Sequence, residues 1–335
     1  MEHEGPPLPT PRGPLSRGID ACLRGAGRLP RLEDVARAEV YGDDLQLALY
    51  LCYELHYRGF AGVPPEREWD PGLLRVRGAM EQRFLSALRT NARVHDSVDE
   101  ALAGLLVEPV EGTGVTHFLR DEGELWQVRE YAAQRSLYHL KEADPHAWVL
   151  PRLWGRAKAA MAAVEFDEWG GGRADRVHAS LFAGLMTDLG LDTAYGRYLD
   201  AASAEALVTV NMMSLFGLHR ALRGALVGHF ATVEITSSPG SRRLAEAMRR
   251  TGAGPAAELF YDEHVEADAV HEQVVRHDVI GGLLESEPHL APDVAFGIDA
   301  TEFVEERFGT RLLADWRASR SSLRAPLARE LAHTS

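Results

Sequence analysis

Two histidines and an aspartate lie along one side of a helical segment, FYDEHVEADAVHEQ, at residues 260–273. On a helix that turns by about 100° per residue, His264, Asp268 and His271 form one narrow stripe. Phe260 falls in the same sector, so the three polar side chains occupy the apolar face that should pack inward. Burying two imidazoles and a carboxylate is costly unless they are paired or bind a metal. The pattern therefore favours a metal site for iron, manganese or zinc over a buried His–Asp pair with a spare histidine.

Further metal-binding side chains stand in upstream helical segments. Asp175 and His178 are one helical turn apart and repeat the Asp-x-x-His spacing found in the first stripe. Two such pairs, with glutamates from other helices, resemble the layout of a di-iron carboxylate bundle. Glu234 is a candidate glutamate because it is the only carboxylate between residues 221 and 238. Its alternative role is that of a helix-end glutamate beside a polar terminus.

Composition limits the classes of site and partner. The chain has 335 residues and a formal net charge of −14, which argues against nucleic acid as a partner because the phosphates would repel it. Its two cysteines, Cys22 and Cys52, form no CxxC pair. A disulfide scaffold, a cysteine zinc site and an iron–sulfur cluster are therefore excluded. Any metal must be held by histidine, aspartate and glutamate.

The sequence also predicts where the protein resides. It contains no stretch of 18 uninterrupted apolar residues, and its start, MEHEGPPLPTPRGP, lacks the apolar core of a signal peptide. We therefore expect a cytoplasmic protein with no membrane partner. Residues 1–16 are rich in proline and glycine and are expected to form a disordered tail.

The remaining pattern is helical, and no period-2 alternation long enough for a sheet occurs, so the predicted fold class is all-α. Asp70 followed by Pro71 marks a helix start, and Gly224 with Gly228 would let a neighbouring helix approach closely. Residues 107–121 are the least regular part. The expected helices cover about residues 43–60, 70–91, 97–106, 122–143, 144–169, 173–189, 203–236, 239–252, 255–284 and 291–308.

Several segments together resemble one known family. They are QRSLYHLKEADPHAWVLPRLWGRAKAA, DEWGGGRADRVHASLF, NMMSLFGLHRALRGALVGHF, EITSS and FYDEHVEADAVHE. They are similar to the actinobacterial iron-containing redox enzymes of the haem-oxygenase-like dimetal oxidase and oxygenase superfamily, over about residues 40–320. The resemblance implies a haem-oxygenase-like seven-helix bundle with additional N-terminal helices. It places an N-terminal helical region at 17–115 and a di-iron domain at 116–325, with two Fe(II) ions that react with O2 and no haem.

The resemblance also implies a ligand set. The family's core ligands fall on Glu168, His178, Glu234, His264, Asp268 and His271. Members that oxygenate nitrogen carry one more carboxylate, whose position matches Glu142, although local pattern alone suggests a solvated charge near a helix N-terminus there. Many members have the first Glu and His seven residues apart, whereas Glu168 and His178 are ten apart around the Gly170–Gly172 triplet. The family pattern leaves out Asp175, which spacing alone would have selected.

The implied activity is O2-dependent oxidation of a small amine, an amino acid or a specialised-metabolite intermediate, with N-oxygenation favoured because of Glu142. Desaturation and oxidative C–C cleavage by the same centre are alternatives, and so is a non-catalytic, ferritin-like metal-binding protein. True haem oxygenase activity would need a proximal histidine, for which His56 is available. The expected partners are the substrate and O2. An external electron donor and a second copy of the chain, in a homodimer, are further candidate partners.

Overall fold

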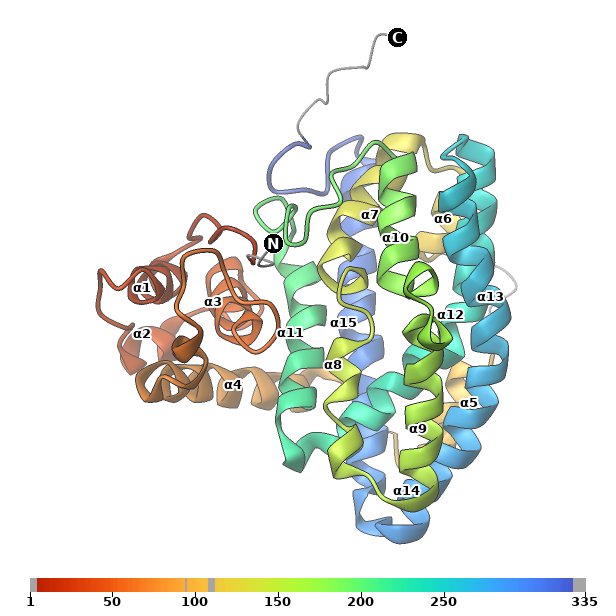
Figure 1. The fold of residues 1–335 in the computed structure, drawn as a ribbon, viewed down its shortest axis with the longest axis horizontal. Helices are drawn as coiled ribbons and strands as arrows, with labels where there is room; N and C mark the ends of the chain where they lie inside the picture. The colour runs from red at the N-terminus through yellow and green to blue at the C-terminus, as the bar shows by residue number, and fades with distance from the viewer. Residues whose placement is uncertain (1–4, 94, 108–111, 328–335) are drawn as a thin grey trace, which may run out of the picture.

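The protein is described by a computed structural model that covers residues 5–93, 95–107 and 112–327, without the side chains of Glu266, Asp268 and Ala269. These residues form helices and no strand, which confirms the all-α prediction. A bundle of long helices runs along one axis (Figure 1). Its members are α7 (Leu125–His139), α9 (Gly155–Glu168), α10 (His178–Asp188), α11 (Ala204–Leu218), α12 (Arg223–Thr251), α13 (Pro255–Val274) and α15 (Ala291–Arg317).

Shorter helices connect or cover the bundle. They are α5 (Val98–Leu105), α6 (Val115–Asp121), α8 (Asp144–Ala147) and α14 (Gly281–Ser286). Helix α6 lies within the stretch that the sequence suggested to be least regular, and it packs against α12. No helix in the described part of the chain is both long and apolar enough to cross a membrane.

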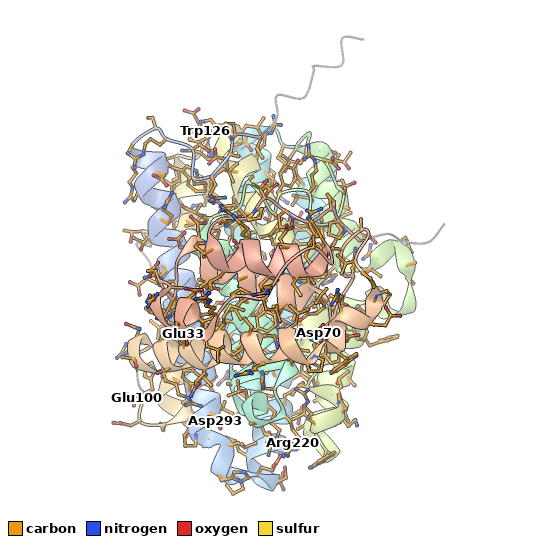
Figure 2. All side chains as sticks on the ribbon, turned by 90° about the vertical axis from the view of Figure 1, so that its left-hand side faces the viewer. Glu33, Asp70, Glu100, Trp126, Arg220 and Asp293 are labelled. Atoms are coloured by element: carbon orange, nitrogen blue, oxygen red, sulfur yellow. The ribbon has the colours of Figure 1, made fainter. Side chains whose placement is uncertain are left out.

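Four N-terminal helices lie together on one side of the bundle (Figure 1), and α4 crosses the long helices (Figure 2). They are α1 (Pro14–Leu23), α2 (Leu32–Arg37), α3 (Asp43–Glu54) and α4 (Pro71–Asn91). Asp70 caps α4 as predicted, because its carboxylate accepts hydrogen bonds from the backbone N–H groups of Gly72 and Leu73. Helix α3 packs on α11, where the Asn211 side chain donates to the backbone carbonyl of Gln46 at 2.8 Å.

The predicted disorder of residues 1–16 is wrong for the part that the structure describes, residues 5–16. The guanidinium of Arg12 donates to the Asp43 carboxylate and to the backbone carbonyls of Leu199 and Ala202. Pro14 already belongs to α1. A proline-rich composition predicts little apolar burial, but it does not report specific hydrogen bonds such as these.

Glycines allow α12 and α15 to touch, as the Gly224–Gly228 spacing predicted. A Cβ on Gly228 would lie 2.0 Å from the Val294 carbonyl oxygen, and one on Gly297 would lie 2.0 Å from the Ala225 carbonyl oxygen. Helix α12 also differs from expectation, because it runs on through Pro239 where two separate helices were predicted. Its packing against α13 and α15 offsets the hydrogen bond that the proline removes.

Helix α13 does not continue regularly to residue 284 as predicted. It passes at Val275 into a π-helical segment, Val275–Ile280, before α14 begins at Gly281. Single π-helical turns inside α-helices are often found at functional sites. Here the segment follows directly after the helix that carries His264 and His271.

Candidate metal centre

Five of the described helices bring six of the predicted ligands together. Glu142 follows α7, Glu168 ends α9, His178 begins α10, Glu234 lies within α12, and His264 and His271 lie on α13. All six side chains are buried. Potential ligand atoms of Glu142, Glu168, His178 and His264 all lie within 4.8 Å of one another, and so do those of Glu168, Glu234 and His271. Glu168 therefore belongs to both groups.

The tautomer of His264 follows from its contact with the backbone. Its Nδ1 lies 2.7 Å from the Phe260 carbonyl oxygen, which can only accept, so Nδ1 carries the proton. In the neutral form of the ring, which metal binding requires, the Nε2 atom then carries the lone pair. It is buried without a hydrogen-bond partner in the described chain and lies 4.0 Å from the Glu142 carboxylate. A backbone carbonyl that accepts from one ring nitrogen and so fixes the other for a metal is typical of metal-binding histidine.

A sharp glycine turn joins Glu168 to His178. Gly170, Gly171 and Gly172 all have positive φ values, which glycine adopts readily. A Cβ on Gly170 would meet the backbone of Arg176 and Val177 at 2.7 Å. The turn returns the chain so that His178 Nδ1 lies 2.7 Å from the Glu168 carboxylate. The ten-residue spacing therefore separates two helices, whose ends meet at the site.

His271 connects carboxylates on α9 and α12. Its Nδ1 lies 3.1 Å from Glu234 Oε2 and 3.8 Å from Glu168 Oε1, and its Nε2 lies 3.2 Å from Asp167 Oδ2. The Asp167 side chain is more than half exposed. Each ring nitrogen of His271 therefore faces a carboxylate, and Asp167 forms the outer boundary of the site.

Glu142 is held in its ionised form by the imidazoles around it. Burial alone would raise its pKa, but His139, His264 and His178 outweigh that effect and lower the pKa of Glu142 to about 2. His139 Nδ1 lies 3.0 Å from Glu142 Oε2, and its ring packs on Phe182 with centroids 4.7 Å apart. Sequence reasoning missed His139, although it stands one helical turn before Glu142.

Glu165 is a buried carboxylic acid that sequence reasoning did not select. Both of its carboxyl oxygens are buried without a hydrogen-bond partner in the described chain. Burial first, and then the charges of Glu168 and Glu234, raise the pKa of Glu165 to about 9. The group therefore carries a proton at neutral pH. The signal that could have identified it is its position one turn before Glu168 on α9.

Two aspartates were also considered as ligands from the sequence, Asp268 and Asp175. Asp268 stands on α13 between the two histidines, and its side chain lies outside the described residues. Asp175 has a largely exposed side chain, 2.9 Å from Arg173, and is not part of either group. Because the glycine turn ends in a short 3-10 helix before α10 begins, Asp175 and His178 do not share one helix face as the Asp-x-x-His spacing suggested.

The donor set fits a pair of metal ions. Three buried carboxylates and three buried imidazoles lie close together, and such a cluster is costly to bury unless cations compensate it. The described ion-pair partners of Glu142 and Glu168 are imidazoles. Oxygen and nitrogen donors without thiolate suit iron or manganese. One carboxylate that belongs to two adjoining groups is compatible with two ions held close together.

A cavity of about 330 Å³ adjoins the cluster. Glu142, Glu168, Glu234 and His264 line it on the side of the cluster, and His146 and His229 are further polar lining residues. His56, the histidine considered for a haem, does not line this cavity. Its Nδ1 lies 2.8 Å from the Glu68 carboxylate in the N-terminal helical region.

Another group of potential ligand atoms has a structural explanation. His95, Asp299 and Glu302 lie close enough together to be considered for a metal. The Asp299 carboxylate, however, accepts from both the backbone N–H and the ring of His95. This pairing ties the segment before α5 to α15.

Comparison with known proteins relates the chain to one protein family and to a characterised enzyme. The family described as iron-containing redox enzyme matches residues 129–305, which is more than half of the chain and includes every residue of the cluster. The chain is also 25% identical over 205 residues, or 61% of its length, to a nitrosourea synthase from Streptomyces achromogenes subsp. streptozoticus. The match covers 42% of that enzyme, so the chain spans less than half the length of this curated relative.

Proposed function

Because the chain belongs to the family of iron-containing redox enzymes, we propose that it is a non-haem di-iron oxygenase that acts on a nitrogen atom of a small amine or amino acid. The observation that carries this proposal is the position of Glu168 in two adjoining groups of buried ligand atoms. One group would hold each ion, and Glu168 would contact both. Asp268, on the same helix as His264 and His271, completes the proposed ligand set.

The proposed residues divide into two sets around Glu168. Glu142, His178 and His264 would hold one ion with it, whereas Glu234 and His271 would hold the other. Bound Fe(II) would supply the electrons that activate O2. The protein contributes the fixed tautomer of His264, the ionised state of Glu142 and a cavity whose lining includes the apolar side chain of Phe230.

Nitrogen is the preferred target for two reasons. Glu142, the additional carboxylate of the nitrogen-oxygenating pattern, lies within 4.8 Å of the other ligand atoms of its group. The similar protein is named for a nitrosourea, a product that contains an oxidised nitrogen. The reaction would insert one oxygen atom into an N–H bond to give a hydroxylamine, and the other atom would leave as water. An external donor would supply the two electrons, which are accompanied by two protons.

The test is oxygen labelling. Protein loaded anaerobically with Fe(II) is exposed to ¹⁸O2 with a panel of amines and amino acids and an electron donor, and the products are analysed by mass spectrometry. The proposal expects one ¹⁸O atom on nitrogen in a product. Products of desaturation or C–C cleavage without labelled nitrogen would replace the proposal with those alternatives. Iron retention without any O2-dependent product would indicate a metal-binding protein.

A further inference from the structure

Two buried histidines that are not proposed ligands also line the cavity. His229 on α12 and His146 on α8 are 0% and 1% exposed, and their ring centroids lie 5.2 Å apart. The Nε2 atom of each ring is buried and has no hydrogen-bond partner in the described chain. Buried polar atoms are rarely left without a partner, so this pair needs an explanation that the metal centre does not supply.

The protonation state of His229 can be derived from its neighbours. The hydroxyl of Thr301 donates to the Gly297 carbonyl oxygen at 2.7 Å, and this uses its single proton. The Thr301 oxygen, 2.9 Å from His229 Nδ1, must therefore accept from that nitrogen. Nδ1 of His229 carries the ring proton, and Nε2 is a lone pair. Burial lowers the pKa of His229 to about 4, so the ring is neutral at neutral pH.

His146 is neutral for the same reason. Burial first, and then the proximity of His229, lower its pKa well below the ordinary value. Its Nδ1 lies 3.5 Å from the Tyr138 hydroxyl, and its ring packs edge-on against Phe230. Packing and burial hold the two rings side by side without a charge on either.

The charges of the cavity indicate which ligand such a pair would receive. Among the described lining residues, Arg135 is the only arginine or lysine. Its guanidinium makes hydrogen bonds of 2.9 and 2.6 Å to both carboxylate oxygens of Glu305, so its positive charge is compensated within the protein. A ligand with N–H donors would instead meet the Nε2 lone pair of His229, and a charged donor makes the stronger hydrogen bond.

We propose that His229, with His146 beside it, forms the subsite that receives an ammonium group of the substrate through a hydrogen bond to His229 Nε2. This inference rests on the proposed function, since it specifies the substrate as a cationic amine with N–H donors. His229 is a binding residue in this account and contacts no metal. The proposed metal ligands thus line one part of the cavity, and the hydrogen-bond acceptor His229 Nε2 belongs to another part.

Nitrogen NMR tests the inference without turnover. The full chain, labelled with [¹⁵N]histidine, is studied by long-range ¹H–¹⁵N correlation in the metal-free form and with Zn(II) as a diamagnetic substitute. His229 is assigned from its absence in His229→Leu. We expect a neutral Nδ1–H tautomer at pH 7. Addition of n-butylammonium should shift the His229 Nε2 signal, whereas tetramethylammonium, a cation without an N–H donor, should not.

Calorimetry compares the affinity for n-butylammonium in two matched variants. His229→Leu should weaken n-butylammonium binding by about tenfold or more, the usual consequence of losing a hydrogen bond to a charged group. Met248→Leu, at a buried residue on the same helix that does not line the cavity, should leave the affinity within about twofold. If His229→Leu fails to fold, His229→Gln takes its place for the assignment, and the wild-type NMR result then decides.

Three results would overturn the inference: a protonated His229 at pH 7, a proton on Nε2, or the same response to both cations. The last would mean that the pair holds only water and that the cavity attracts cations non-specifically. None of these results depends on iron loading or on ¹⁸O incorporation. Failure of this subsite and failure of the proposed oxygenation are therefore distinguishable.

Discussion

At the scale of single residues, His264 and His229 use the same arrangement for different purposes. In each ring Nδ1 donates to a fixed oxygen, that of Phe260 or Thr301, and Nε2 is left as a buried lone pair. His264 Nε2 lies 4.0 Å from Glu142, among the proposed metal ligands. His229 Nε2 has no ion pair with a carboxylate in the described chain, although the charge of Glu305 acts on the ring. The surroundings of the lone pair thus separate a proposed ligand from a proposed substrate contact.

His178 and Asp175 offer a sharp residue-level test of the ligand set. Removing a metal ligand should cost more than the roughly 10- to 100-fold loss of affinity that follows loss of a supporting residue. His178→Ala should therefore lose iron in a competition with a chelator. Asp175→Ala, at an exposed position three residues earlier, should retain wild-type affinity. Equal iron loss in both variants would restore Asp175 as a ligand.

Glu165 predicts an unusual pH dependence of stability. Its folded-state pKa is raised to about 9, so the stability it contributes is complete below the ordinary value of 4.5 and is lost as the pH rises toward about 9. Glu165→Gln resembles the protonated acid and cannot ionise. In metal-free protein this variant should be more stable than wild type at about pH 8, by more than about 1 kcal/mol, and similar to wild type at about pH 5.

Denaturant unfolding across that pH range measures the effect. Glu285→Gln, at a largely exposed glutamate, is the matched control and should change stability by less than about 0.5 kcal/mol. A parallel pH dependence in wild type and Glu165→Gln would show that Glu165 ionises normally. In that case other groups must account for any loss of stability at high pH.

At the scale of elements, α13 combines apolar residues and proposed metal ligands on its inner face. Phe260 and Tyr261 are buried beside His264, and His271 is buried two turns later. Without metal, burial of these imidazoles near carboxylates lacks its full compensation. The helix is therefore the element whose local stability should depend most on metal.

Hydrogen exchange tests this dependence. Amides of residues 260–275 should exchange at least about tenfold more slowly in the Fe(II)-loaded protein than in the metal-free protein, because metal binding adds to local folding free energy. Amides of α4, which contributes no proposed ligand, provide the internal control and should change little. The same protection of 260–275 in both forms would contradict the prediction.

The crossing of α12 and α15 carries a second element-level prediction. Gly228→Ala would place a Cβ 2.0 Å from the Val294 carbonyl oxygen, so the two helices must separate. Overpacking of this kind typically costs about 1–3 kcal/mol of unfolding free energy. Gly78→Ala on α4 meets nothing within 4 Å and should instead stabilise by about 0.5–1 kcal/mol. Thermal or denaturant unfolding compares the two, and equal effects would refute the close approach.

At the scale of the whole molecule, the N-terminal helices are joined to the site through a buried ion pair. Lys141, next to Glu142 in sequence, lies 2.9 Å from the Glu54 carboxylate on α3, and both side chains are almost fully buried. The Tyr195 hydroxyl also donates to Glu54 at 2.7 Å, and Arg58 donates to the Leu140 carbonyl oxygen. The segment that carries Glu142 is thus held from the side of the N-terminal helices.

Sequence periodicity was sufficient for the features that repeat locally. The all-α class, the cap at Asp70 and the inward face of α13 all follow from spacing along one helix. The separation of two helices at Gly170–Gly172 was also predicted, and the structure confirms it. The way this turn brings Glu168 and His178 together was not predicted, because it depends on contacts between the two helix ends. The long continuation of α12 through Pro239 also depends on tertiary packing, which a local pattern does not contain.

The site residues also divide into those that the sequence pattern predicted and those that it did not. Spacing indicated His264 and His271, and the solitary carboxylate in an apolar run indicated Glu234. Glu142 came from family resemblance, since nothing in its local sequence sets it apart. The residues that sequence reasoning missed, His139, Glu165 and His229, become unusual through what surrounds them in three dimensions, although Glu165 also stands one turn before Glu168. An imidazole or carboxylate becomes unusual when burial removes water and neighbours leave one of its atoms without a partner.

The most direct test of the central claim is the iron content of variants at Glu168, which belongs to both groups, and at one further carboxylate from each group, Glu142 and Glu234. Anaerobically reconstituted wild type should hold about two iron ions per chain, as a two-metal site requires. Glu168→Ala should lose most of both, whereas Glu142→Ala and Glu234→Ala should each retain more iron than Glu168→Ala. Full occupancy in Glu168→Ala, or a single iron in wild type, would contradict a two-metal centre built around Glu168.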